Sequence, residues 1–346
     1  MFSEIYPSAS RYIEVDKGTD LRSVINIELK KNLIVGEEWL ISRYRIDTLF
    51  DSFNSENYIY YFKGECAQEF NEDIARFAAD KKIAVITAFG GGKVMDASKH
   101  AAEIAGCSII TYPSSPATCA SFTPVSVMYT KEGIFERYNY LSKSPDCLIM
   151  DWNILLDCPV RYYASGAGDS IAKYYESLPA VKAAAAGAEG LFLKVPAYIL
   201  EESMRYLRYN LPRTGSGDMD ILKHIARINI FFSGLVSGLG GENFGTGIPH
   251  FTANALTAYK KAREKLHGEA AVFGTLLERY LENEDDYRSL AQLMGAACLP
   301  CRLSAFGITE AEIDALAQKI IKGNEDEGNT AVIDPKALRF ALGDLL

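Results

Sequence analysis

The sequence predicts an α/β domain with a mainly parallel sheet, followed by an all-helical domain. Two observations support this fold class. Over the first 150 residues, short apolar runs alternate with amphipathic stretches, and beyond about residue 159 the strand signals stop and the helical patterns lengthen. The chain has 346 residues, enough for two domains of roughly 100 to 200 residues each. We expect the domains to span residues 1–158 and 159–346.

The first half contains apolar runs that are continuous rather than alternating, which is typical of strands covered on both faces. We expect strands over residues 31–36, 58–62, 83–88, 108–112 and 147–150. Apolar residues at helical spacing predict helices over 67–80 and 94–105. Strands that alternate with helices in this way form βαβ units, and these build a parallel, twisted sheet.

The second half reads as helices with two glycine-rich interruptions. We expect helices over residues 169–177, 180–209, 218–238, 250–266, 269–281 and 310–322. In the third of these, Ile221, Ile225, Ile228, Phe232 and Leu235 fall on one face. Residues 238–247 contain five glycines and interrupt the pattern.

Composition excludes several classes of function. The chain carries 36 Lys and Arg against 45 Asp and Glu, a net charge of −9 with no concentrated basic segment, so we expect no nucleic-acid partner. No run of about 18 apolar residues occurs, so we expect no membrane span. Seven scattered cysteines and the absence of a leader-like N-terminus favour a cytoplasmic setting. Cys298 and Cys301 read as two thiols, because no second pair of zinc ligands lies nearby.

A glycine turn follows the predicted strand 83–88. The segment Gly90-Gly91-Gly92-Lys93 leads directly into the helix that starts near Val94. Glycines let a ligand approach the backbone, and a helix N-terminus offers unpaired N–H groups with a partial positive charge. The turn therefore suits an anion such as a phosphate. A plain glycine-rich connection is the alternative interpretation.

Three residues form a candidate metal site. Only four histidines occur in the chain, and two of them, His250 and His267, stand beside glycine turns. Asp169 ends the segment Ser165-Gly-Ala-Gly-Asp169, where we expect a loop to become a helix. One carboxylate and two imidazoles bind a divalent ion and leave positions open for substrate. The alternative is a capping aspartate and two core histidines.

Several segments resemble the iron-containing alcohol dehydrogenase superfamily. Residues 90–99, Gly-Gly-Gly-Lys-Val-Met-Asp-Ala-Ser-Lys, are similar to its Gly-Gly-Gly-x-x-x-Asp-x-x-Lys signature, and Lys93 suits the glycerol dehydrogenase branch. Gly168-Asp169 with Glu176 seven residues later, and Leu266-His267-Gly268-Glu269, resemble two further segments of that family. The resemblance implies an N-terminal Rossmann-like domain and a C-terminal helical domain, the dehydroquinate synthase-like fold. It also implies that Asp169, His250 and His267 hold one divalent metal, Zn or Fe(II).

The resemblance further implies that the glycine turn holds the pyrophosphate of a nicotinamide dinucleotide. Glu37 follows the strand 31–36, where such folds place a carboxylate on the adenosine ribose, and this favours NAD over NADP. Glu37 could instead be a solvated residue at a helix start. The cofactor contacts that we carry over by resemblance are Glu37, Gly90, Gly91, Gly92, Lys93, Asp96, Thr111, Ser114, Thr118, Ser121, Val125 and Tyr129.

Cys119 bears on the substrate. Residues 113–129 are similar to the glycerol dehydrogenase segment in which an Asp holds a polyol hydroxyl, and Cys119 occupies that position. A thiol is a weak hydrogen-bond partner without a charge at rest. The same segment also resembles hydroxycarboxylate dehydrogenase members of the family. We therefore expect hydride transfer between NAD(P) and a small polyol, diol or 2-hydroxy acid, or the corresponding carbonyl compound.

The remaining residues and rival functions complete these expectations. We expect His224 and His100 to be structural, with His100 paired to Asp96, and Glu269 to hold a neighbouring histidine or cap its helix. Three rivals stay open: an sn-glycerol-1-phosphate dehydrogenase, a dehydroquinate synthase-like lyase, and an inactive homologue that binds NAD and metal. A homo-oligomer is compatible with the sequence.

Overall fold

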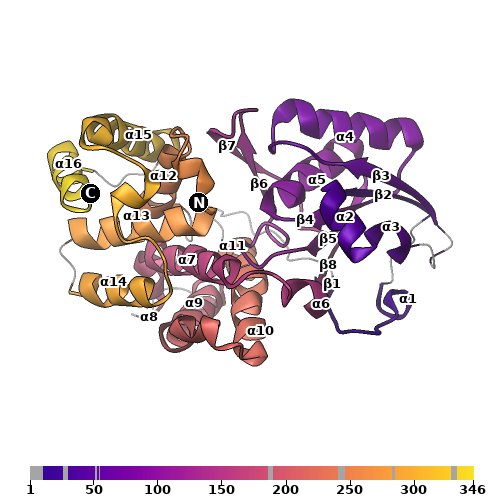
Figure 1. Ribbon diagram of the computed structural model, residues 1–346, viewed down its shortest axis with the longest axis horizontal. Coiled ribbons are helices and arrows are strands. Elements are labelled where there is room, and N and C mark those ends of the chain that lie inside the picture. The colour runs from indigo at the N-terminus through magenta and orange to yellow at the C-terminus, as the bar shows by residue number, and fades with distance from the viewer. Residues whose placement is uncertain are drawn as a thin grey trace. The chain divides into compact units, whose positions relative to one another are not determined.

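The protein is described here from a computed structural model that covers residues 11–25, 30–50, 53, 55–185, 190–240, 246–282, 285–328 and 333–346. The chain forms two compact units, Ile5–Pro159 and Val160–Leu346. Figure 1 labels the helices and strands of both units.

The first unit is built on a six-stranded sheet with the order β1-β8-β5-β4-β2-β3. All five pairings in the sheet are parallel. A separate antiparallel hairpin pairs β6 with β7. The strands are β1 (Arg11–Val15), β2 (Lys31–Gly36), β3 (Glu56–Tyr61), β4 (Val85–Gly90), β5 (Ser108–Pro113), β6 (Val125–Tyr129), β7 (Phe135–Tyr140) and β8 (Cys147–Asp151).

Helices cover both faces of the sheet (Figure 1). They are α1 (Leu21–Val24), α2 (Glu38–Tyr44), α3 (Ile46–Leu49), α4 (Gln68–Lys81), α5 (Gly92–Ala105) and α6 (Trp152–Leu155). On β2, Leu33 and Val35 pack in one core with α4 and α5, whereas Ile34 packs in the other core with α2 and α3. Because both faces are buried, the central strands are apolar throughout, and the predicted parallel sheet is confirmed.

The sequence pattern identified five of the six sheet strands and missed β1 and the hairpin. Along β1 the burial alternates between partly buried and buried positions, and most of β7 is partly or fully exposed. Strands with one face in solvent lack the continuous apolar run on which the prediction relied.

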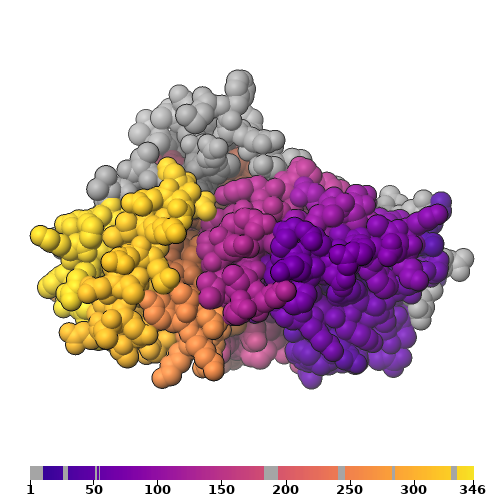
Figure 2. Space-filling model, turned by 90° about the horizontal axis from the view of Figure 1, so that it is seen from above, coloured from indigo at the N-terminus to yellow at the C-terminus, as the bar shows by residue number. Residues whose placement is uncertain are grey.

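The second unit is helical, as expected for the fold class. Its helices are α7 (Val160–Glu176), α8 (Leu178–Ala185), α9 (Gly190–Asn210), α10 (Met219–Arg227), α11 (Ser233–Gly240), α12 (Ile248–Leu256), α13 (His267–Leu281), α14 (Tyr287–Ala296), α15 (Ile313–Asp326) and α16 (Pro335–Asp344). A π-helical turn, Ile228–Phe232, joins α10 to α11. In the view of Figure 2, the C-terminal segments in yellow lie against the orange segments that include α13.

Two helix bounds predicted in this unit need correction, and two helices were missed. The helix expected to start at residue 169 starts at Val160, and the one expected over 250–266 ends at Leu256. The helices α14 and α16 were not predicted. Part of the glycine-rich interruption, residues 241–245, lies outside the described residues.

Within the described part of the chain, no helix is both long and apolar enough to span a bilayer. All seven cysteines are free thiols, with Cys298 exposed and Cys301 half-buried.

Candidate active site

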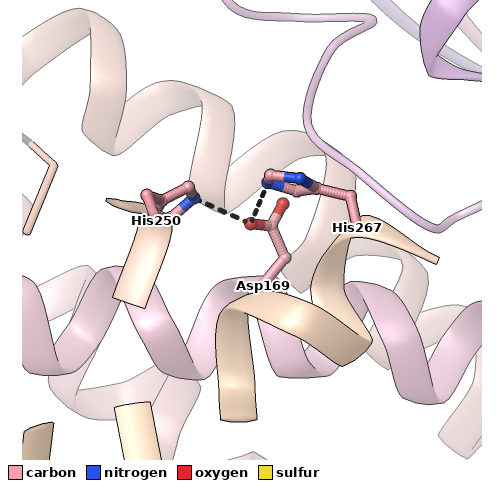
Figure 3. A group of neighbouring side chains, drawn as sticks. All are labelled: Asp169, His250 and His267. Atoms are coloured by element: carbon pink, nitrogen blue, oxygen red, sulfur yellow. Dashed lines mark hydrogen bonds and ion pairs between the residues drawn. The ribbon is translucent and has the colours of Figure 1, made fainter. Parts of the chain in front are cut away.

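The structure brings the three predicted metal ligands together. Asp169 on α7, His250 on α12 and His267 on α13 each offer one ligand atom, and these atoms all lie within 4.8 Å of one another. The Nε2 atoms of His250 and His267 lie 3.2 Å and 3.7 Å from Oδ1 of Asp169. Figure 3 shows both imidazoles directed at this carboxylate. The donor set therefore converges from helices that are far apart in the sequence.

Glycines allow the ligand-bearing helices to approach closely. A Cβ atom on Gly268 would lie 1.8 Å from the carbonyl oxygen of Ser165, and one on Gly168 would lie 2.6 Å from the carbonyl oxygen of Gly268. These glycines adjoin His267 and Asp169, so the close contact of α7 with α13 sets the spacing of the two ligands. The expected transition from loop to helix at Asp169 is wrong, because Gly166 and Gly168 lie inside α7 and Gly168 serves this contact.

Both histidines lie at helix starts. His250 is in the first turn of α12, after the N-cap Gly247 and beside Pro249. His267 is the first residue of α13. A proline in the first turn costs no backbone hydrogen bond, and the fixed start orients the side chains that follow it. The N-terminal turns thus present the imidazoles to Asp169.

Glu269 caps helix α13, which is one of the two roles expected from the sequence. One of its carboxylate oxygens accepts a hydrogen bond from the backbone N–H of Leu266 at 2.9 Å. The Arg161 guanidinium also pairs with both oxygens, at 2.7 Å and 2.8 Å. Glu269 therefore ties the start of α13 to the start of α7.

Glu176 holds His250, and the sequence analysis did not assign it this role. Its Oε2 atom lies 2.7 Å from Nδ1 of His250. Its Oε1 atom accepts hydrogen bonds from the backbone N–H groups of Gly247 at 2.7 Å and His250 at 3.1 Å. A carboxylate on Nδ1 fixes the tautomer that leaves Nε2 free to bind a metal. The available signal was the seven-residue interval from Asp169, which places both carboxylates on one face of α7.

Electrostatics in the cluster follow from burial and charge. Burial opposes protonation of His250, but the carboxylates of Glu176 and Asp169 outweigh it and raise its pKa to about 10. Burial lowers the pKa of His267. Burial would raise the pKa of Asp169, but the hydrogen bond from His250 and the charges nearby hold it below its usual value. Asp169 is therefore anionic and ready to bind a cation.

The glycine turn connects β4 to α5 in the first unit. A Cβ atom on Gly90 would lie 2.7 Å from Cγ2 of Val94, and one on Gly92 would lie 3.1 Å from Oγ1 of Thr118. Gly91 is the N-cap of α5 and has no side chain to cap it. Lys93 pairs with Glu65, with Nζ 2.6 Å from Oε1. The turn thus leaves the start of α5 open to an anionic ligand.

Glu37 lies at the carboxyl end of β2, beside a hollow of about 400 Å³. The hollow is lined by Glu37, Glu38, Trp39, Phe62 and Lys63. Burial raises the pKa of the Glu37 carboxyl, and the Lys93 ammonium opposes this shift. Trp39 is 62% exposed.

The other residues expected by resemblance to contact the cofactor lie in the first unit, where several of them form hydrogen bonds within the protein. Asp96 is buried against Lys99 at 2.9 Å and accepts a hydrogen bond from the N–H of Val127 at 3.2 Å, so it holds β6 on α5. Thr111 donates to the carbonyl oxygen of Ser121 at 2.6 Å. The hydroxyl of Ser121 is buried and has no hydrogen-bond partner among the described residues.

Four further residues predicted to contact cofactor or substrate lie near the turn or on β6: Ser114, Cys119, Val125 and Tyr129. The backbone N–H of Ser114 donates to the carbonyl oxygen of Gly90 at 2.8 Å, which ties the end of β5 to the turn. Val125 and Tyr129 are the half-buried ends of β6. Cys119 is half-buried, and its carbonyl oxygen accepts the N–H of Phe122 at 2.9 Å.

The two other histidines do not belong to the group formed by Asp169, His250 and His267. His100 is buried with Nδ1 3.0 Å from Nδ2 of Asn71, so the expected pairing with Asp96 is wrong, because Asp96 pairs with Lys99. His224 stacks on Tyr206 with ring centroids 5.4 Å apart.

Comparison with known proteins identifies the class. The profile of the family described as iron-containing alcohol dehydrogenase matches residues 12–152. A probable glycerol dehydrogenase from Sinorhizobium meliloti 1021 has the same fold, with a TM-score of 0.84, 24% identity, and coverage of 99% of this chain and 98% of that one. The fold and the matching family define an oxidoreductase that acts on CH–OH groups.

Curated relatives place the chain within that class. A glycerol dehydrogenase from Escherichia coli O6:H1 is 29% identical over 94% of this chain and 90% of its own length. A glycerol dehydrogenase from Pseudomonas putida is 30% identical over 72% of this chain and 69% of its own length. A hydroxycarboxylate dehydrogenase A from Escherichia coli K12 is 28% identical over 81% and 79%. The chain belongs to the iron-containing alcohol dehydrogenase family.

Proposed function

We propose that this protein is a metal-dependent, NAD-linked dehydrogenase of a small polyol, diol or 2-hydroxy acid, and a reductase in the reverse direction. The single observation that carries the proposal is the convergence of Asp169, His250 and His267 within 4.8 Å. One carboxylate and two imidazoles fit Zn or Fe(II) equally, and three protein ligands leave room for a substrate oxygen. A divalent ion held there would polarise that oxygen as a Lewis acid.

The chain's own residues would prepare this chemistry. Glu176 would keep the Nε2 lone pair of His250 directed at the ion, because its carboxylate accepts a hydrogen bond from Nδ1–H. Asp169 supplies the negative charge that a divalent ion needs. Asp169 is buried and the two histidines are partly buried, which would reduce the screening by water of their interaction with the ion.

The first unit would hold the dinucleotide. The open start of α5 after Gly91 and Gly92 suits the pyrophosphate, and Glu37 suits the adenosine ribose. A carboxylate at Glu37 would accept the 2′-hydroxyl and repel a 2′-phosphate, which favours NAD over NADP. The nicotinamide would exchange hydride with the carbon that bears the substrate oxygen.

The relatives support a dehydrogenase rather than the three rival functions. The curated names reported above are those of two glycerol dehydrogenases and a hydroxycarboxylate dehydrogenase. Where the glycerol dehydrogenase pattern has an aspartate this chain has Cys119, so we propose that glycerol is not its preferred substrate.

A substrate screen tests the proposed function. Protein loaded with Zn or Fe(II) would be assayed at 340 nm with NADH and NADPH against neutral and acidic carbonyl compounds. We expect turnover with NADH, and Asp169→Asn should lose both stoichiometric metal and activity, with His224→Asn as the control. Cofactor and metal binding without turnover on any compound would refute the proposal.

A further inference from the structure

One face of α7 carries three charged residues. Asp169, Lys173 and Glu176 follow one another at intervals of four and three residues, which places them along a single stripe of the helix. The two carboxylates are occupied, since Asp169 faces both histidines and Glu176 holds His250. Lys173 lies between them in the sequence and contacts neither.

Lys173 is a half-buried lysine whose ammonium contacts a neutral hydroxyl group. Its Nζ atom bonds to Oγ of Ser237 on α11 at 2.5 Å. Among the described residues, no carboxylate oxygen lies within the 4.0 Å of Nζ that defines an ion pair. Charged groups removed from water are normally paired, because desolvation of a lone charge is costly. An ammonium has three donors, so two remain after the bond to Ser237.

The charge of Lys173 reaches the metal cluster. Its ammonium is close enough to interact electrostatically with Asp169 and His267. Side chains four residues apart on a helix have Cβ atoms about 5–6 Å apart, so Lys173 and Asp169 leave α7 side by side. With a divalent ion present, the charges of the ion, Lys173, Asp169 and Glu176 leave one positive charge in excess. A neutral polyol would leave that charge uncompensated.

We infer that Lys173 binds the carboxylate of a 2-hydroxy or 2-oxo acid whose adjacent oxygen is held at the Asp169, His250 and His267 site. The inference rests on the proposed function and narrows its substrate class to acids. In such a substrate the carboxylate is bonded directly to the carbon that carries the reacting oxygen. The ammonium of Lys173, one helical turn from Asp169, can therefore contact the substrate carboxylate while the metal site holds the reacting oxygen of the substrate.

A matched pair of substrates isolates the carboxylate. Pyruvate and hydroxyacetone share the methyl ketone and differ in a carboxylate against a hydroxymethyl group. We expect the wild-type protein with NADH to prefer pyruvate in kcat/KM. Lys173→Met should reduce the ratio of kcat/KM for pyruvate to that for hydroxyacetone by about 10- to 100-fold, mainly through KM, as expected for a lost hydrogen bond to a charged group. Lys173→Arg should keep most of the preference.

The variant Ser237→Ala distinguishes substrate binding by Lys173 from a purely structural role of this side chain. It removes the only side-chain hydrogen bond of Lys173 within the described residues but keeps its charge, so the substrate ratio should stay within about threefold of wild type. If Lys173 only ties α7 to α11, Ser237→Ala and Lys173→Met will have the same effect on both substrates, and the inference is overturned.

Binding without turnover gives an independent measurement. Oxamate has the planar carboxylate of pyruvate and is not reduced. It should raise the Tm of the metal-loaded wild-type and Lys173→Arg proteins but not that of Lys173→Met. Reduction of hydroxyacetone but not pyruvate by the wild-type protein would overturn this inference and leave the proposed function standing. Failure to reduce any carbonyl compound would refute both.

Discussion

Glu278 on α13 is a buried acid whose ionisation should destabilise the fold. It is 8% exposed, and its Oε2 atom lies 3.7 Å from the Arg279 guanidinium without a hydrogen-bond partner among the described residues. It lines a hollow of about 270 Å³ together with Glu176. Burial, and then the charge of Glu176, raise the pKa of Glu278 to about 8. Glu278→Gln keeps the size of the side chain and removes the ionisation.

The sign and size of the effect follow from linkage. Between the ordinary carboxyl pKa of 4.5 and the folded value of about 8, the folded protein keeps a proton that the unfolded chain has released. The free energy of unfolding therefore falls as pH rises through this window, by about 1.4 kcal/mol per pH unit. At pH 7 the accumulated cost is about 3 kcal/mol, and Gln does not incur it. Below pH 4.5 the two proteins should differ little.

Urea unfolding of wild type and Glu278→Gln at pH 5, 6, 7 and 8 measures this difference. Titrating groups that do not interact with Glu278 act equally on both proteins, so the difference in unfolding free energy reports Glu278 and its coupling to Glu176. We expect the advantage of the variant to grow with each pH step. Glu325→Gln, on α15 with an exposed side chain, is the control and should show no such growth. A difference that is independent of pH would refute the reasoning.

Three further outcomes are expected. Glu176→Gln should weaken metal binding about 10- to 100-fold in competition with a chromophoric chelator, because Nδ1 of His250 loses its carboxylate, and unchanged affinity would contradict that role. Gly268→Ala should lower the unfolding free energy by about 3 kcal/mol or more, since its Cβ would overlap a carbonyl oxygen of α7. The control Gly295→Ala in α14 places its Cβ in open space and should raise the unfolding free energy by up to about 1 kcal/mol. Equal unfolding free energies of the two variants in urea would argue against the close contact. Trp39→Phe should abolish most contact quenching of tryptophan emission by NAD+, because the other tryptophan, Trp152, is 2% exposed. Undiminished quenching would place the adenosine away from the hollow.

Continuous apolar runs made the sheet predictable, because a parallel sheet buried on both faces selects such runs. The hairpin of β6 and β7 was not predictable in this way. Its half-exposed strands are held partly by Asp96, whose carboxylate accepts the N–H of Val127. That contact joins residues 31 positions apart and has no local signal.

Part of the candidate site was likewise predictable from the sequence, and part was not. Rare histidines beside glycines, and an aspartate in a family-like segment, indicated the three residues that lie together in the structure. The meaning of the glycines was not readable locally, since Gly168 lies within a helix and serves contact with α13 rather than a turn. Glu176 lies 74 positions from His250, so only the folded chain shows that it holds this imidazole.

The contact between Gly268 and the backbone of Ser165 has a consequence for the choice of ion. Since main chain meets main chain at Gly268, the spacing of Asp169 and His267 in the proposed metal site is determined by two helices that cannot separate without losing their packing. A site held in this way would suit small ions with short bonds to nitrogen and oxygen, and it would discriminate against Ca²⁺, whose longer bonds and six to eight oxygen ligands need a wider, more flexible shell.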